Sequence, residues 1–147
     1  MVVGVFFGGF IMFVNGFLSP WGFAGLNLPF QMMGMAVAGI SGGLYRKFSQ
    51  NMKFSARFCL ETAVLGAFIA LVYDLITNFG FGIQLMLAGM DPTSALFVAI
   101  AYGSFFSIVH VLSNSAVFGI LFLPVTNALN SLKVGELLWW RKEPLCS

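Results

Sequence analysis

The stretch "GAFIALVYDLITNFG", residues 66–80, decides the class of fold. It is a continuous apolar run without the alternation of a barrel strand, so it predicts a helix that lies in lipid. Asp74 interrupts this run. Because a charged side chain inside such a segment is costly, Asp74 is a candidate for a functional group.

The whole chain shares the apolar character of this stretch. Of its 147 residues, 59% are hydrophobic and only 8% are charged, and the mean hydropathy is +0.95. A soluble domain carries about 25% charged residues, so this chain has too little polar surface for a water-facing shell. We therefore predict an all-α integral membrane protein. The net charge of +2 is too small to indicate a nucleic-acid partner.

Four apolar blocks divide the chain. They are residues 2–18, 28–45, 56–78 and 93–129. The last block is too long for one span of about 20 residues and barely long enough for two. We divide it into a short outer or re-entrant helix over residues 93–105, broken near Gly103 and Ser104, and a full span over residues 106–129. The predicted fold is a polytopic membrane bundle of about four full spans plus this short helix, over residues 1–132.

Basic residues predict the orientation of the bundle. All seven lysines and arginines fall in two clusters. The clusters are Arg46, Lys47, Lys53 and Arg57, and then Lys133, Arg141 and Lys142. The positive-inside rule puts the basic loop 46–57 and the interfacial C-terminal tail, residues 133–147, in the cytoplasm. Residues 19–27 and 80–92 are then predicted to be loops on the outer side.

Small residues predict where the helices approach one another closely. Gly4 and Gly8 form a GxxxG pair, and Gly34, Ala38 and Gly42 form a ladder in the next segment. Such spacings are typical of packing between membrane helices and do not by themselves indicate a partner protein.

Polar side chains from four segments fall at one predicted depth, near the outer surface. Asp74 and Asn78 lie four residues apart and share one helix face. His110 and Asn114 have the same spacing in the last segment. A few convergent polar groups between apolar walls are typical of a ligand pocket. The predicted substrate-binding residues are Asn15, Trp21, Gln31, Tyr73, Asp74, Asn78, His110 and Asn114.

Simpler roles compete with ligand binding at several positions. Asn15 can merely bond a neighbouring helix, as polar residues in membrane helices often do. Asp74 is either protonated by burial or paired with His110. Glu61 is predicted to pair with Arg57, four residues earlier.

Motifs for catalysis and cofactor binding are absent from the sequence. The single histidine and the two cysteines form no zinc motif, and neither a nucleophile elbow nor a Walker-type glycine loop occurs. We therefore expect a chain that is not an enzyme and that binds no cofactor itself.

Three stretches together resemble a known family. They are "NGFLSPWGFAGLNLPFQMMGMAVAGISGGLYRK", "GAFIALVYDLITNFG" and "HVLSNSAVFGILFLPVTNAL". The order of an Asn near Pro-Trp-Gly, a Pro-Phe-Gln-Met helix start, a late Asp and Asn, and His-x-x-x-Asn resembles the substrate-binding S component of energy-coupling factor (ECF) transporters. The likeness covers most of residues 4–130, and the family's first two helices have no counterpart here.

The resemblance implies a multi-pass subunit of a prokaryotic plasma membrane that captures a vitamin or related micronutrient at the outer face. Such a subunit docks on a membrane coupling subunit and on two ATPase subunits, which use the ATP. All the candidate residues except Tyr73 fall at substrate-facing positions of the family. Two alternatives stay open: a structural subunit whose polar groups only join helices, and a proton-coupled carrier that uses Asp74 and His110.

Overall fold

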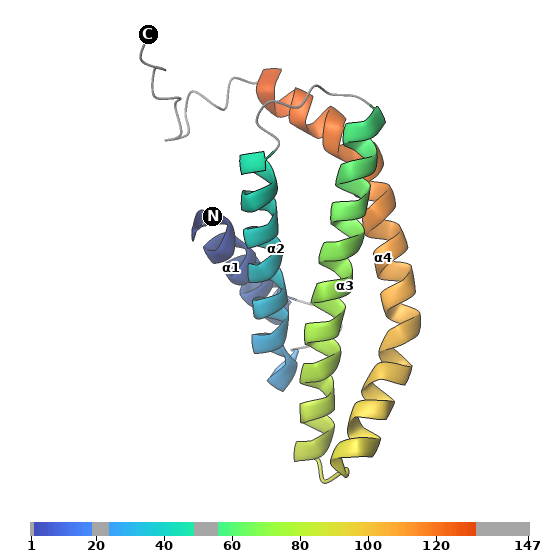
Figure 1. The fold of residues 1–147 in the computed structure, drawn as a ribbon. Coiled ribbons are helices and arrows are strands. Elements are labelled where there is room, and N and C mark those ends of the chain that lie inside the picture. Colours follow the sequence, from blue (N-terminus) through green and yellow to red (C-terminus); the bar gives the residue numbers. More distant parts are fainter. Residues whose placement is uncertain (1, 19–23, 49–55, 132–147) are drawn as a thin grey trace.

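The computed structural model describes residues 2–18, 24–48 and 56–131 (Figure 1). Within these ranges the chain forms four α-helices and one short 3-10 helix. The elements are α1 (Val2–Leu18), η1 (Gly25–Asn27), α2 (Leu28–Phe48), α3 (Ala56–Leu87) and α4 (Pro92–Ser131). The predicted all-α bundle is confirmed, while the predicted tail, residues 133–147, lies outside the described residues.

The helices form two antiparallel pairs that lie side by side. α1 packs on α2 and α3 packs on α4, and the smaller contact between α2 and α3 joins the pairs (Figure 1). Glycines allow the first pair to approach closely. A Cβ added to Gly39 would collide with the backbone carbonyl of Gly4, and one added to Gly8 would collide with the carbonyl of Met35. The close approach predicted for Gly4 and Gly8 is therefore confirmed, with Gly39 as an additional partner.

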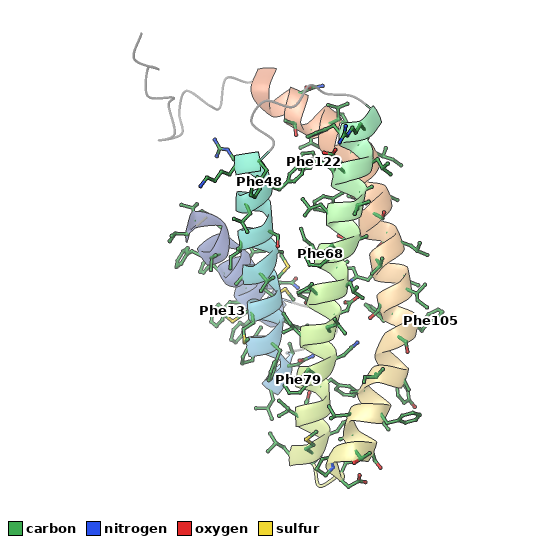
Figure 2. The ribbon with its side chains drawn as sticks, in the orientation of Figure 1. Phe13, Phe48, Phe68, Phe79, Phe105 and Phe122 are labelled. Carbon is green, nitrogen blue, oxygen red and sulfur yellow. The ribbon has the colours of Figure 1, made fainter. Side chains whose placement is uncertain are left out.

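Two of the described helices are long and apolar enough to cross a membrane, over Arg57–Leu87 and Pro92–Ala128. Large apolar side chains point outward from them: Phe105 projects away from α3 and is 76% exposed (Figure 2). Small residues such as Ala70, Ala95 and Ala99 fill the contacts between helices instead. A protein in water would bury its large apolar groups, so this distribution favours a surface that faces lipid.

The predicted break near Gly103 and Ser104 is wrong, because α4 runs without interruption from Pro92 to Ser131. A glycine inside a helix costs only about 1 kcal/mol relative to alanine, and packing on α3 readily offsets that. Ser104 satisfies its own hydroxyl by donating to the carbonyls of Ile100 and Ala101 at 2.7 and 3.0 Å. Residues 93–105 are therefore the first part of one long helix.

The predicted outer loop over residues 80–92 is also wrong for most of its length. α3 continues to Leu87, since Gly80 lies under the ring of Phe30 and Gly82 lies against Leu96 of α4. Helix packing therefore overrides the weak helix propensity of these glycines. The real connection is a short turn after Leu87.

This turn ends α3 and starts α4 by ordinary capping chemistry. Gly89 has a φ of 96°, its N–H donates to Met86 O, and Met90 N–H donates to Leu85 O at 3.1 Å. These are the two hydrogen bonds of a Schellman motif. Asp91 then caps α4, because its carboxylate accepts a hydrogen bond from Ser94 N–H at 2.9 Å.

The far end of α4 bends over the start of α3. The helix changes direction in its last turns, next to Phe122, and Pro124 lies inside this stretch (Figures 1 and 2). A proline lacks the N–H for the helical hydrogen bond and clashes with the preceding turn, which accounts for the bend. The rings of Phe58 and Phe122, with centroids 5.8 Å apart, pack α3 against α4 here.

Candidate functional site

A cavity of about 480 Å³ lies where the two helix pairs meet. Its walls come from η1, the first turn of α2, the C-terminal half of α3 and the middle of α4. The lining residues are Asn27, Gln31, Tyr73, Asp74, Thr77, Asn78, Phe81, Tyr102, Gly103, Phe106, Ser107 and His110. The site therefore depends on the packing of both pairs and belongs to no single helix.

Asp74 and His110 join α3 to α4 at one wall of this cavity. Asp74 is only 6% exposed, and its Oδ1 lies 2.8 Å from His110 Nδ1. This contact is one of the two alternatives that the sequence left open for Asp74. An ionised carboxylate can accept a hydrogen bond from Nδ1–H whether the imidazole is neutral or protonated. The ring of Tyr73 meets the imidazole edge to face, with centroids 5.7 Å apart, so His110 is held on two sides.

Two acceptor oxygens at the cavity are buried without a hydrogen-bond partner among the described residues. They are Asp74 Oδ2 and Asn27 Oδ1. Buried polar atoms are nearly always paired in folded proteins, because an unpaired one loses its hydration without replacement. Both atoms belong to residues that line the same cavity, although the atoms themselves are covered. A donor that reached this wall would give them the missing partner.

Asn27 is a site residue that the sequence reasoning missed, since it treated residues 19–27 as an ordinary loop. Asn27 ends η1 and lies four residues before Gln31, and both line the cavity. Its carboxamide oxygen rests against Gly80, where an added Cβ would collide with it. The spacing of Asn27 and Gln31 across the start of α2 is a signal that could have found it.

The other wall is built on α3 and α4. Asn78 lines the cavity and packs against Gly103, where a Cβ would collide with the carboxamide. Thr77 also lines it, but its hydroxyl is used within α3, since it donates to Tyr73 O at 3.1 Å. Tyr102 and Phe106 form a rim, and Tyr102 is 78% exposed. Neither aromatic residue was predicted from the sequence.

The cavity contains five of the eight predicted substrate-binding residues: Gln31, Tyr73, Asp74, Asn78 and His110. Asn15 does not line it and is exposed on α1. Asn114 does not line it either, because its carboxamide donates to His110 O at 3.0 Å and is used inside α4. Trp21 lies outside the described residues.

Positive charge is concentrated away from this cavity. No lysine or arginine occurs among the described residues that line it. Arg57, at the start of α3, pairs with Glu61 at 2.9 Å, as predicted. Within the described ranges, no three His, Cys, Asp or Glu side chains lie close enough together to hold a metal ion.

Comparison with known proteins adds no identification: no family model, no curated protein and no solved structure matches the chain.

Proposed function

We propose that this chain is the membrane-embedded substrate-binding subunit of an ECF-type uptake transporter and captures a small micronutrient in the cavity between α2, α3 and α4. One observation carries the proposal: buried polar groups from separate elements converge on a cavity within an otherwise apolar bundle. Such polar groups are costly inside a membrane protein, so they are functional hypotheses by default. The volume of the cavity suits a small organic molecule.

In the proposed orientation the cavity lies in the outer part of the membrane. The basic residues Arg46, Lys47 and Arg57 mark the cytoplasmic end by the positive-inside rule. Asp74 lies about 25 Å further along α3 at 1.5 Å per residue, and a hydrocarbon core is about 30 Å thick. A ligand from the outside then reaches the carboxylate without crossing most of the bilayer.

Binding rather than catalysis is the proposed role of each group. Asp74 and Asn27 accept hydrogen bonds from the ligand, and the carboxamides of Gln31 and Asn78 add adaptable donors and acceptors. Tyr102 and Phe106 cover the apolar part of the ligand. Energy for release into the cell comes from ATP hydrolysis by two partner ATPases, which reach this chain through a membrane coupling subunit.

Mass spectrometry of small molecules that co-purify with the full chain tests the binding role. Asp74→Asn should reduce the retained ligand about ten- to a hundredfold, since a hydrogen bond to a charged group contributes about 1.5–3 kcal/mol. Glu61→Gln is the matched control, because it makes the same change on the same helix away from the cavity. If Glu61→Gln loses as much ligand as Asp74→Asn, or if no small molecule is ever retained, the binding role is wrong.

The Asp74–His110 pair favours one alternative, a proton-coupled carrier, because a carboxylate and an imidazole together can relay a proton. Reconstituted vesicles separate the two functions. The binding subunit alone should bind ligand without accumulating it, and uptake should need the partner subunits and ATP. Uptake by this chain alone, driven by a proton gradient, would establish the carrier instead.

A further inference from the structure

Two residues that line the cavity each carry a polar atom without a hydrogen-bond partner in the described part of the chain, and the two atoms are of the same kind. Asp74 Oδ2 and Asn27 Oδ1 are both acceptors, and both are buried without a donor among the described residues. A ligand that fits them must bring N–H or O–H groups, because another acceptor at this wall would leave both sides unpaired.

The charged groups at the cavity also disfavour an anionic ligand. With a neutral imidazole, the Asp74–His110 pair carries one negative charge, and with an imidazolium it carries none. The other titratable groups that line the cavity are the phenols of Tyr73 and Tyr102. Since no described lining residue is a lysine or arginine, an anionic ligand would meet no cation there other than an imidazolium that is already paired with Asp74.

Aromatic rings complete the description of the ligand. Phe81, Tyr102 and Phe106 line the cavity together with Tyr73. Aromatic faces attract cations and stack on flat rings. Accepting this cavity as the substrate site of the proposed function, we infer that it selects a small, flat, cationic molecule with N–H donors and rejects an anion of the same shape.

Three probes of nearly identical shape test this selectivity: benzamidinium, benzamide and benzoate. They share a ring and a planar head group, but they are cationic, neutral and anionic in turn. Binding is measured by isothermal titration calorimetry on the full chain in nanodiscs of phosphatidylcholine, a lipid without net charge. Benzamidinium should bind at least about tenfold more tightly than benzamide, because its contact with the carboxylate is charge-assisted. Benzoate should bind most weakly.

Variants assign the preference to the cavity. Asp74→Asn should reduce the affinity for benzamidinium about ten- to a hundredfold and bring it near that of benzamide, while Glu61→Gln should leave both unchanged. Tyr102→Ala should weaken benzamidinium binding severalfold. Tyr102 is exposed, so this second variant keeps the test valid if Asp74→Asn fails to fold.

Three outcomes overturn the inference: benzoate binds as tightly as benzamidinium, the three probes bind equally, or benzamidinium does not bind. In the first two, loss of probe binding in Asn78→Leu would show that the cavity still receives ligands, so the proposed function would stand. In the third, the co-purification experiment decides separately whether the proposed function also fails.

Discussion

At the scale of single residues, the contact with His110 gives the Asp74 carboxylate a hydrogen-bond partner between two apolar helices. The imidazole pairs with Oδ1, while Oδ2 is buried without a partner among the described residues. A fully paired carboxylate would only join the helices, whereas one with a free oxygen can also bind a ligand. The same side chain therefore serves the packing of α3 on α4 and the chemistry of the site.

Removal of both partners should destabilise the fold less than the sum of the two single removals. Replacing His110 leaves a buried carboxylate unpaired, whereas replacing both residues removes the problem. In a double-mutant cycle of Asp74→Ala and His110→Ala, we expect a coupling of about 0.5–3 kcal/mol in the free energy of unfolding. Unfolding in mixed detergent micelles measures this coupling.

The Arg57–Glu61 pair is the control for this cycle. It has similar geometry, at 2.9 Å, but the Arg57 side chain is 85% exposed. Exposed pairs of this kind contribute about 0.3–0.5 kcal/mol. Equal coupling in the two pairs would mean that burial of Asp74 adds nothing to the interaction.

At the scale of elements, glycines set the distance between α1 and α2. Gly39→Ala should destabilise the protein by about 1–3 kcal/mol, because its methyl group would overlap the backbone of Gly4 and force the helices apart. Gly42→Ala is the matched control on the same helix, since nothing lies within 4 Å of a Cβ there. It should be neutral or stabilise by up to about 1 kcal/mol. Thermal unfolding of both variants tests this difference, and equal effects would contradict the packing role of Gly39.

The start of α4 should depend on pH through its capping residue. The hydrogen bond from Ser94 N–H holds the pKa of Asp91 below its usual value. A lowered folded pKa means that the cap stabilises the helix above the unfolded pKa, about 3.9. This contribution is lost as the pH falls through the folded value.

The Asp91→Asn variant tests this cap, because asparagine also caps helices but does not titrate in this range. The measurement is hydrogen exchange of the backbone amides near Ser94. When the pH falls from neutral to about 3, these amides should lose more protection in the wild type than in the variant. Identical pH profiles would show that the carboxylate does not control this end of α4.

At the scale of the whole molecule, the two ends of the bundle differ in charge. Phe48 lies at the basic end of α2, and the turn between α3 and α4 lies at the opposite end (Figures 1 and 2). The turn carries Asp91 and no basic residue. The positive-inside rule therefore predicts that the turn faces outward.

Cysteine labelling in intact cells tests this orientation. With Cys59 and Cys146 replaced by alanine, Met90→Cys in the turn should react with a membrane-impermeant maleimide added outside. Phe48→Cys should react only after the membrane is opened. Both positions are exposed, so a difference reports the side of the membrane. The reverse pattern would invert the proposed topology and put the cavity near the cytoplasm.

The sequence by itself determined the all-α class and the shared helix face of Asp74 and Asn78, and it offered the contact of Asp74 with His110 as one of two alternatives. The class follows from composition and the shared face from local helical spacing, whereas the contact between α3 and α4 and the meeting of Gln31 with Asp74 at one cavity needed the packing of the helices. The length of α3, the continuity of α4 and the place of Asn27 in the cavity were decided only by the tertiary structure. Glycines at positions 80, 82 and 103 read as breaks in isolation, but Phe30, Leu96 and Asn78 pack into the space they leave. Contacts between elements far apart in the chain thus outweigh a local preference of about 1 kcal/mol for each glycine.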